Sequence, residues 1–421
     1  MAYTPQPRTT MLGRDPYSIP LDEFDVSQAA LFQSNTMWGF FDRLRKEDPI
    51  HYCKDSEFGP FWSVTKFDDI MAVEGNPEVF SSKPAISLQD PDQELNVSMF
   101  IAMDEPEHGN QRRTVQEAVA PRNLANMEEL IRERAGTILD SLPVGETFNW
   151  VDKVSVELTT QMLATLLDFP QENRHKLTYW SDVATQVPGP GSICSTVEER
   201  NKILIGECVP AFMGMWMERA AAEPRFDLIS MMAHGEATKN MAQERPMEFL
   251  GNLLLLIIGG NDTTRNSISG SVLFLNENPG EYAKLKANPD LVTNMVPEII
   301  RYQTPVIHMR RTATQDFDLK GKPIKKGDKV VMWYVSGNRD ETAIDKPYEF
   351  IIDRERPRHH LAFGFGIHRC MGNRLAEMQL RVVWEEILKR FEKVELVGEL
   401  ARANSNLVKG YTQLPVRVHP L

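Results

Sequence analysis

Cysteine is scarce in this chain of 421 residues, and its four cysteines are scattered without a CxxC spacing. That scarcity argues against a disulfide framework and a zinc site, and it favours a reducing compartment. Long apolar runs are also missing, because the longest aliphatic stretch, Leu253–Ile258, is far too short to span a bilayer. The first 20 residues are polar and lack the apolar segment of a secretion signal. We therefore expect a cytoplasmic protein without a transmembrane segment.

Positive charge is in deficit as well, because 47 lysines and arginines stand against 59 acidic residues, a net charge of −12. Such an acidic chain is a poor binder of nucleic acid unless a basic patch is local. A dinucleotide-binding GxGxxG is absent too, since FGFGIHRC lacks the third glycine. With 42% apolar and 25% charged residues, the composition is that of a globular protein. The sequence thus predicts neither a nucleic-acid partner nor a fused reductase.

What is present is mainly helical periodicity, with apolar residues at i, i+3 and i+4 over long stretches. Strand signals are confined to residues 61–67, residues 329–334 and the tail beyond Lys393. These patterns predict a mainly α fold with small β-sheets (α+β), in one domain over residues 1–421 that begins with an irregular arm over residues 1–20. The expected helices span residues 38–47, 107–119, 123–142, 154–167, 197–222, 247–275, 291–302 and 371–391.

One cysteine, Cys370, lies in the stretch FGFGIHRCMG directly before a helical pattern. Gly364 and Gly366 permit positive φ and a close approach of the backbone to a flat ligand, and Gly372 lets the next helix start against that ligand. A loop that runs into a helix N-terminus offers N–H donors and positive potential, which keep a thiolate ionised. Such a sulfur can be the axial ligand of haem iron. The plain alternative is an inert, buried cysteine.

A second pattern, LLLLIIGGNDTT over residues 253–264, predicts a helix that is buried on most sides. Two adjacent glycines in its middle cost about 1 kcal/mol each relative to alanine, so they indicate a need for space. Gly259 and Thr263 share one helical line, and Ile258 and Asp262 share the next. Space, a hydroxyl and a carboxylate side by side suit the binding of dioxygen and the delivery of protons. The alternative is a buried helix whose Asp–Thr pair is satisfied locally.

Together these motifs resemble the cytochrome P-450 superfamily, and FGFGIHRCMG is similar to its haem-thiolate signature at every defining position. The resemblance implies a helix-rich triangular prism around a buried haem b, with Cys370 as the metal ligand. It also implies a monooxygenase with O2 as co-substrate, in which Asp262 and Thr263 take the catalytic acid and alcohol positions. The implied haem-binding residues of the loop are Phe363, Gly364, His368, Cys370 and Gly372.

Further matches to the family lie outside the cysteine loop. DEPEHGNQR, residues 104–112, matches DxPxHxxxR, and the resemblance implies that His108 and Arg112 reach one haem propionate. Arg311 in HMRRTA matches another propionate contact and keeps the family's RxA spacing, which Arg310 does not. Buried carboxylates need such cations or hydrogen-bond donors.

Glu298 and Arg301 form an ExxR pair on one face of a predicted helix, a spacing that at a surface stabilises by only about 0.2–0.5 kcal/mol. The resemblance implies a buried structural pair that an arginine ahead of the cysteine loop completes. Arg354 is the better match. Arg356 is the alternative, because the linker from this region to the cysteine loop is one residue longer than is usual in the family.

Two segments are expected to be loops: residues 81–103, rich in Ser, Pro and Asp, and residues 187–192, whose VPGPGS breaks a helix. Long loops in a compact domain are usually functional. The resemblance implies that the first covers the haem pocket and that the second belongs to a mobile lid over the substrate entrance. A pair of plain surface connections is the alternative.

Electron supply follows from the resemblance, which implies transfer from NAD(P)H through a separate reductase and an iron–sulfur ferredoxin. Arg369, Arg374 and Arg358 lie near the cysteine in sequence and make a local basic patch on an acidic chain. Such a patch steers an acidic partner by long-range electrostatics. A solvated charged face is the alternative.

For the substrate, segments such as TPVIHMRRTA and VVMWYVSGNRD resemble the bacterial terminal alkane and fatty-acid hydroxylases. This resemblance implies omega-hydroxylation of medium-chain linear alkanes or fatty acids. Burial of each methylene gains about 0.8 kcal/mol, enough to hold such a chain without a polar anchor. The predicted apolar pocket residues are Leu255, Ile258, Gly259, Val306 and Ile307.

Three other functions stay open at this point. The first is a hydroxylase of sterol side chains or branched lipids. The second is a haem-thiolate sensor, which would not need Asp262 and Thr263, and the third is a protein with a structural Cys370 and no haem. Met213, Met215 and Met217 either line the substrate entrance or, as is commoner for methionine, form adaptable core.

Overall fold

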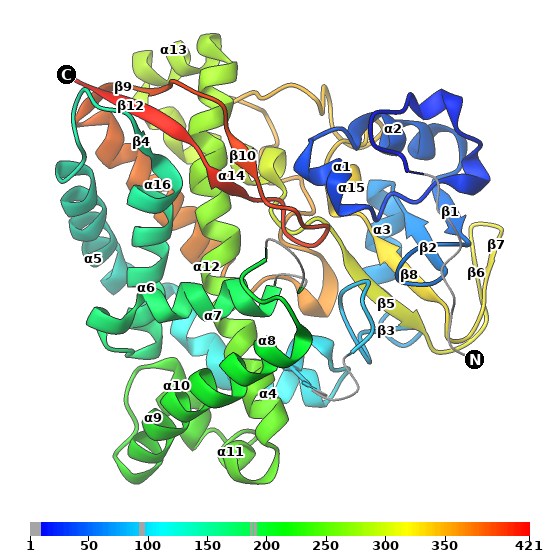
Figure 1. Ribbon diagram of the computed structural model, residues 1–421, viewed down its shortest axis with the longest axis horizontal. Coiled ribbons are helices and arrows are strands. Elements are labelled where there is room, and N and C mark those ends of the chain that lie inside the picture. The colour runs from blue at the N-terminus through cyan, green and yellow to red at the C-terminus, as the bar shows by residue number, and fades with distance from the viewer. Residues whose placement is uncertain (1–9, 92–96, 186–187, 189–191) are drawn as a thin grey trace.

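The computed structural model describes residues 10–91, 97–185, 188 and 192–421. A large helical part lies beside a smaller part that holds the main sheet (Figure 1), so the fold is mainly α with small β-sheets. The helices are α1 Ala29–Gln33, α2 Trp38–Glu47, α3 Phe67–Glu74, α4 Glu107–Gln116, α5 Pro121–Asp140, α6 Glu157–Leu167, α7 His175–Thr185, α8 Val197–Ile203, α9 Val209–Ala221, α10 Leu228–His234, α11 Met241–Glu244, α12 Pro246–Glu277, α13 Pro279–Ala287, α14 Val292–Gln303, α15 Tyr334–Gly337 and α16 Asn373–Leu388. The strands are β1 Ile50–Cys53, β2 Phe61–Val64, β3 Phe80–Ser81, β4 Phe148–Asn149, β5 Met309–Ala313, β6 Phe317–Leu319, β7 Lys322–Ile324, β8 Lys329–Met332, β9 Phe391–Leu396, β10 Ala401–Arg402, β11 Tyr411–Gln413 and β12 Pro415–Pro420.

The main sheet has the strand order β1-β2-β8-β5-β3. Strand β2 runs parallel to β8, with Trp62 opposite Val330, and β5 runs antiparallel to both of its neighbours. The remaining strands form smaller sheets in the orders β4-β12-β9, β10-β11 and β6-β7. Because successive side chains of a strand point to opposite faces, neighbouring residues of β5 face different surroundings.

The expected helices are found, and helix α2 has the bounds that the periodicity predicts. Two others are interrupted by π-helical turns, Val151–Val156 ahead of α6 and Leu204–Cys208 between α8 and α9. Such turns keep the helical direction while they shift which side chains face the core. Apolar spacing alone therefore predicted longer regular helices than the chain forms.

Two expected strands end early because helices begin inside them. Strand β2 ends at Val64, and α3 begins at Phe67, whose N–H donates to a carboxylate oxygen of Asp340 at 2.9 Å. That bond satisfies an otherwise free N–H of the first helical turn, and its acceptor comes from a distant segment. Strand β8 likewise ends at Met332, before α15 begins at Tyr334.

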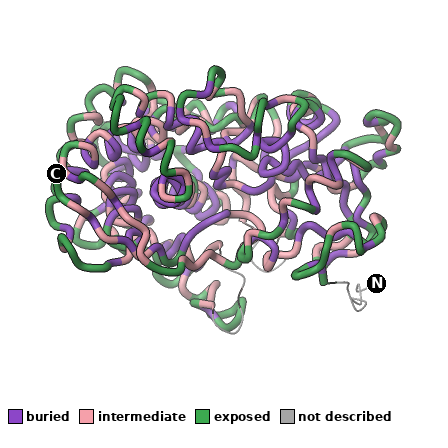
Figure 2. Tube along the Cα trace, turned by 90° about the horizontal axis from the view of Figure 1, so that it is seen from above, coloured by how far each residue is buried: buried purple, intermediate pink, exposed green. Residues whose placement is uncertain are grey.

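Helix α12 is the centre of the helical part, where it packs against α6, α7, α14 and α16. Seen from above in Figure 2, buried residues fill the interior and exposed ones lie at the periphery. The apolar run Leu253–Ile258 of α12 is largely buried, as its composition predicts. A long helix that is enclosed by neighbours can hold a reactive side chain in a fixed place.

Three of the expected segments lie partly outside the described residues: the arm in residues 1–9, the loop 81–103 in residues 92–96, and the loop 187–192 except for residues 188 and 192. Within the described part of the arm, Pro16–Ser18 forms a 3-10 turn. Across the described ranges, no helix has the length and apolar character needed to cross a membrane.

Candidate functional site

A cavity of about 1570 Å³ lies between helix α12 and the cysteine loop ahead of α16. Small-molecule sites usually measure about 300–1000 Å³, so this cavity has room for a flat cofactor and a substrate together. The cysteine loop, residues 363–372, forms one side of the cavity. Five residues of this loop predicted to bind haem line it: Phe363, Gly364, His368, Cys370 and Gly372.

The cysteine loop is held in a tight shape by its own backbone and by the end of helix α3. The N–H of Cys370 donates to the carbonyl oxygen of Phe363 at 2.8 Å, which closes the loop. Gly364 and Gly366 both have a φ of +67°, a conformation in which a side chain would be strained. At Gly366, a Cβ atom would also lie 2.5 Å from the carbonyl oxygen of Glu74. This position of the loop therefore requires glycine.

The Cys370 side chain faces the cavity just ahead of the N-terminus of α16. It is accessible from the cavity, although protein encloses it on the other sides. Burial raises the pKa of its thiol, while a hydrogen bond from the Gly372 backbone and the charges of Arg112 and Arg369 lower it in part. Donors and positive charges of this kind suit a sulfur that binds a metal ion as the thiolate.

Three side chains at one edge of the cavity suit the acidic groups of a haem. Arg112, Arg311 and His368 all line it. The Nδ1 atom of His368 is buried without a hydrogen-bond partner among the residues that the structure describes, and its Nε2 lies 2.7 Å from the Ser82 hydroxyl. A pair of carboxylates would meet two positive charges and an available ring nitrogen there. The residues present therefore fit a haem with two propionates.

His108 lies behind this edge and is not among the described residues that line the cavity. Its ring packs 4.1 Å from the ring of His368, and its Nδ1 lies 2.9 Å from the carbonyl oxygen of Phe100. Its Nε2 lies 3.2 Å from the carbonyl oxygen of Ile367. His108 thus supports the loop that carries His368, and its contact with a propionate stays a prediction.

Arg311, rather than Arg310, faces the cavity, as the spacing of HMRRTA indicates. Arg310 is on the alternate face of β5 and pairs with Asp90 at 2.6 Å. Arg311 donates to the carbonyl oxygen of Arg310 at 2.9 Å, and its Nη2 lies 3.5 Å from Glu74. Arg311 is therefore positioned by the protein before any ligand binds.

Glu74, the last residue of α3, is a buried carboxylate in the cavity wall that sequence reasoning missed. It accepts hydrogen bonds from the Tyr334 hydroxyl and from the backbone N–H of Phe365. Burial raises the pKa of Glu74, while the charge of Arg311 opposes the rise. Glu74 belongs to no motif, so only its distant partners identify it.

On the opposite side of the cavity, α12 presents a glycine pair and a threonine. A Cβ atom at Gly259 would meet no other atom within 4 Å, so this residue borders open space. A Cβ atom at Gly260 would lie 3.1 Å from Leu163 of α6, so this glycine serves packing. The Thr263 hydroxyl lines the cavity and donates to the carbonyl oxygen of Gly259. Both glycines line the cavity, but of the two only Gly259 borders space that a Cβ atom could enter without contact.

Asp262 is only 1% exposed, yet it belongs to the cavity wall. Its carboxylate accepts a hydrogen bond from Ser181 at 3.1 Å and pairs with Arg265 at 3.0 Å. Burial raises the pKa of Asp262 to about 6; the charge of Arg265 opposes the rise and that of Asp182 adds to it. A carboxyl group with that pKa takes up and releases protons near neutral pH.

Arg265 and Asp182 complete this cluster, and sequence reasoning missed both. Arg265 lies 2.8 Å from Asp182, which helix α7 carries next to Ser181. The i, i+3 spacing of Asp262 and Arg265 in GGNDTTRN was the available signal for the arginine. No sequence signal pointed to Asp182, because its contact with Arg265 depends on how α7 packs on α12.

Four of the residues predicted to border the substrate line the cavity: Leu255, Ile258, Gly259 and Val306. Ile307 does not, and the prediction for it is wrong. Its side chain is fully buried in a core cluster with Trp333. Val306 and Ile307 lie in an extended segment, where successive side chains point to opposite faces, so only one of them faces the cavity.

The three alternating methionines of α9 do not line the cavity either. Met213 and Met215 are partly buried against the helical core, and Met217 is 61% exposed. The interpretation of this stripe as adaptable core and surface is therefore favoured over the substrate entrance.

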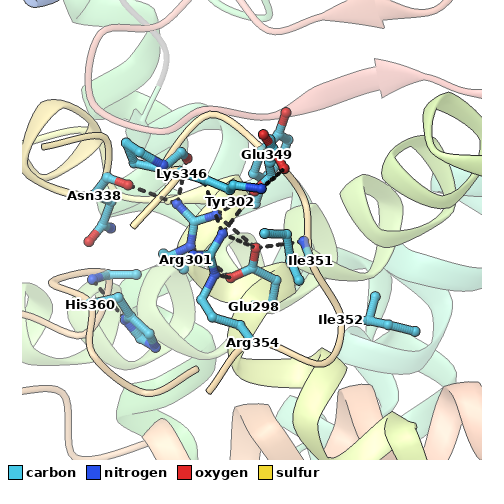
Figure 3. Close-up of polar contacts among 12 residues, drawn as sticks. Glu298, Arg301, Tyr302, Asn338, Lys346, Glu349, Ile351, Ile352, Arg354 and His360 are labelled. Carbon is cyan, nitrogen blue, oxygen red and sulfur yellow. Dashed lines mark hydrogen bonds and ion pairs between the residues drawn. The ribbon is translucent and has the colours of Figure 1, made fainter. Parts of the chain in front are cut away.

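Glu298 of α14 is bound by two arginines, as Figure 3 shows. The Nε of Arg301 lies 2.7 Å and the Nε of Arg354 lies 3.0 Å from the same carboxylate oxygen. Glu298 and Arg301 are fully buried. Arg356 is exposed and contacts His359 instead. Arg354 therefore completes the network, which anchors the segment that leads to the cysteine loop.

The basic patch of the sequence is reduced to two residues. Arg369 and Arg374 are exposed next to the cysteine loop. Arg358 is exposed too, but Glu377 pairs with it at 2.8 Å and offsets its charge.

Comparisons with known proteins agree with this geometry. A family model described as Cytochrome P450 matches residues 216–406. The chain is 34% identical to a linalool 8-monooxygenase of Pseudomonas putida, over 94% of its own length and 99% of the relative's. It is 30% identical to a methyl-branched lipid omega-hydroxylase of Mycobacterium tuberculosis, over 97% of each chain. The solved structure of cytochrome P450-153 from Novosphingobium aromaticivorans is 44% identical with a TM-score of 0.88, over 94% of this chain and 99% of that one.

Proposed function

The chain belongs to the cytochrome P450 family and is a haem-thiolate monooxygenase, and we propose that it hydroxylates the terminal carbon of medium-chain linear alkanes or fatty acids. The observation that carries the proposal is one cavity in which Cys370 lies on one side and Thr263 on the other, with Leu255, Ile258 and Val306 beside them. Such a cavity accepts a flat cofactor and, above it, an apolar chain.

Cys370 would hold the iron, and Arg112, Arg311 and His368 would hold the propionates. When bound, the haem supplies the oxygen chemistry, so that one atom of O2 enters an unactivated C–H bond. The loop closed by the Cys370–Phe363 hydrogen bond fixes the sulfur before the cofactor binds. Preorganised ligands of this kind keep the geometry of a metal site constant through a reaction.

Asp262 and Thr263 would provide protons to the distal side of the cavity. Asp262 is buried, and its pKa of about 6 lets it hold a proton at the acidic side of neutrality and release it above. The Thr263 hydroxyl borders the open space at Gly259, and because its hydrogen is donated to the Gly259 carbonyl oxygen, its oxygen can accept a hydrogen bond from that space. General acid catalysis of this kind contributes about 10²–10⁴-fold in rate.

Terminal selectivity would come from orientation, because a terminal methyl group is harder to oxidise than the methylene next to it. A pocket wall of Leu255, Ile258 and Val306 that admits only the end of a chain brings that carbon to the reacting position. The chain's resemblance to terminal alkane and fatty-acid hydroxylases supports this substrate class. So does the relative that is named an omega-hydroxylase.

Electrons would reach the haem from NAD(P)H through a separate reductase and an iron–sulfur ferredoxin. Arg369 and Arg374 lie exposed beside the cysteine loop on a chain with a net charge of −12. A local positive patch on an acidic protein accelerates the encounter with an acidic partner and makes it sensitive to salt.

A branched lipid or a sterol side chain is the second candidate substrate. Two observations favour it: one relative is named for methyl-branched lipids, and the cavity exceeds the usual volume of a ligand site. The remaining volume above a haem would accept a wider chain than a linear alkane.

One experiment tests the proposal: the ferrous–CO spectrum of the purified protein, followed by optical titration of the ferric form. We expect a thiolate-type CO band and a low- to high-spin shift with linear alkanes or fatty acids of medium length. A spin shift with sterols or branched lipids alone would replace the substrate class and leave the enzyme class intact. Loss of the thiolate-type band would overturn the role of Cys370.

A further inference from the structure

His308 lies between two loops that line the cavity but are far apart in sequence. It precedes β5 and is fully buried. Its Nδ1 is 2.9 Å from the carbonyl oxygen of Asn406, and its Nε2 is 3.2 Å from the backbone nitrogen of Leu88. Leu88 and Asn406 both belong to the cavity wall. A single ring thus joins the two loops at the site.

The partners of His308 determine its protonation. A carbonyl oxygen only accepts, so Nδ1 carries the hydrogen; the N–H of Leu88 only donates, so Nε2 offers its lone pair. The neutral Nδ1–H tautomer alone satisfies both bonds. Burial lowers the pKa of His308 to about 4, which keeps the ring neutral at pH 7.

Other contacts hold the first loop at Ile86 and Asp90. At Leu88, Arg310 Nη1 lies 3.4 Å from the carbonyl oxygen, whereas His308 binds the backbone N–H. The N–H of Arg310 donates to the carbonyl oxygen of Ile86 at 2.7 Å, and the guanidinium of Arg310 pairs with Asp90. Lys329 of β8 pairs with Asp90 as well, at 2.8 Å. These charged groups are paired with one another, so the contact at His308 depends on hydrogen bonds and burial.

The second loop is also tied down. The side chain of Asn406 donates to the carbonyl oxygen of Ser27 at 2.9 Å, so this loop is fixed to the N-terminal part of the chain. Leu88 is only 1% exposed and packs in the core cluster that contains Trp333. The ring of His308 lies 5.0 Å from the ring of Trp333, which limits its rotation. The link between the loops is therefore rigid.

We propose that His308 is a positioning residue that determines specificity: by joining Leu88 to Asn406 it fixes the shared wall of the cavity and sets the width open to an apolar chain. The inference rests on the proposed function only for the chemistry of the ligand. The link itself is a property of the protein without ligand.

Two substitutions separate the two bonds. In His308→Asn the side-chain amide reaches the place of Nδ1, which keeps the bond to Asn406 and removes the acceptor for Leu88. In His308→Gln the amide oxygen reaches the place of Nε2, which keeps the acceptor for Leu88. His234→Asn is the control, because its Nε2 lies 2.9 Å from the carbonyl oxygen of Arg219 and it is not part of the cavity wall within the described residues.

The readouts are amide hydrogen exchange of the haem-loaded protein and the range of ligands that give a spin shift. In His308→Asn we expect exchange of the Leu88 amide to accelerate about ten-fold and wider ligands, such as sterols, to gain affinity over linear chains. In His308→Gln the Leu88 amide stays protected. Unchanged Leu88 exchange and an unchanged ligand range in His308→Asn would overturn the proposal.

A measurement on the unsubstituted protein covers the case in which neither variant folds. Nitrogen-15 spectra of histidine-labelled protein at pH 7, with the signals assigned to residues, should show the His308 ring neutral and in the Nδ1–H tautomer. If the His308 ring carries its hydrogen on Nε2, the link between the loops does not exist. Failure of all linear ligands to shift the spin state would instead overturn the proposed substrate class, because exchange and tautomer are measured independently of it.

Discussion

The Thr263 hydroxyl donates a hydrogen bond to the carbonyl oxygen of Gly259 at 3.1 Å, so the threonine proposed to act in the cavity is held by the glycine that opens it. This bond keeps the hydroxyl at the cavity wall and leaves the oxygen lone pairs to accept a hydrogen bond. It also bonds back one helical turn without interrupting α12.

Replacing Thr263 by alanine should therefore retain the haem and the fold but uncouple the reaction. Reducing equivalents are expected to appear as peroxide, because the hydroxyl no longer directs protons to the reacting site. The ratio of product to NAD(P)H consumed measures the effect, with Thr263→Ser as the control that keeps the hydroxyl. Fully coupled hydroxylation by the alanine variant would exclude the assigned role.

Asp262→Asn should remove a titration near pH 6 from the pH–rate profile. The pKa of Asp262 is raised from 3.8 to about 6 by burial, so its carboxyl is protonated below pH 6 and ionised above. As a proton donor it should make kcat fall as the pH rises through that value. We expect the variant to lose about 100-fold in kcat and to lose this inflection. An unchanged profile would assign the inflection to another group.

The same residue predicts a change in stability. Because the folded pKa lies above that of the unfolded chain, ionisation of Asp262 opposes folding as the pH rises from 3.8 through 6. We compare the urea midpoint of Asp262→Asn with that of the unsubstituted protein at each pH. The midpoint of the variant, relative to that of the unsubstituted protein, should therefore be higher at pH 7 than at pH 4. If the difference between the two proteins is the same at both pH values, the carboxyl is not buried as an ionisable group.

Cys370→Ala should abolish the thiolate-type ferrous–CO band, because no other cysteine lines the cavity within the described residues. Cys208→Ala is the matched control. Cys208 is buried, and burial raises the pKa of its thiol to about 12, so it should remain an inert thiol. The control should keep the band at full height, and a weakened band there would show that the spectrum reports folding rather than ligation.

Gly259→Ala and Gly260→Ala should have opposite consequences. The methyl group at 259 enters open space, so we expect a preference for shorter or thinner ligands and a stability gain of up to about 1 kcal/mol. The methyl group at 260 lies 3.1 Å from Leu163, so we expect it to lower stability and to alter the ligand range less than the methyl group at 259 does. Optical titration with a chain-length series and urea unfolding measure both effects.

Arg354→Ala should destabilise the protein by about 3–5 kcal/mol, because it breaks a buried ion pair with Glu298. Arg356→Ala removes an equal charge from an exposed position and should stay within about 0.5 kcal/mol. Urea unfolding in parallel gives the comparison. Equal losses in the two variants would mean that the buried network does not anchor the segment ahead of the cysteine loop.

Short motifs predicted residues that line the cavity, in the cysteine loop, in GGNDTT and at Arg311, because each motif depends on residues close together in the chain. Helical periodicity predicted α2 and the extent of α12 for the same reason. The predictions fail where contacts between segments distant in sequence determine the local structure. Strand β2 stops short of Phe67 because Asp340 binds its N–H, and Ile307 turns into the core because its segment is extended.

Glu74, Asp182 and His308 could not be predicted as parts of the site by such patterns. Each contacts partners from other elements: Glu74 binds the cysteine loop, Asp182 binds α12 through Arg265, and His308 binds two loops. Their positions depend on tertiary packing, which a single sequence does not encode in a local spacing. The choice between Arg354 and Arg356 was open for the same reason.

Gly259 and Gly260 of α12 differ in how a substitution would be accommodated. At Gly260 a Cβ atom would lie 3.1 Å from Leu163, so a larger residue requires Leu163 to shift. At Gly259 a Cβ atom would meet no other atom within 4 Å, so a substitution there leaves the helix packing unchanged and affects the space for a ligand instead. A single substitution at position 259 can therefore reshape the space open to a ligand, while the packing of α12 on α6 stays intact.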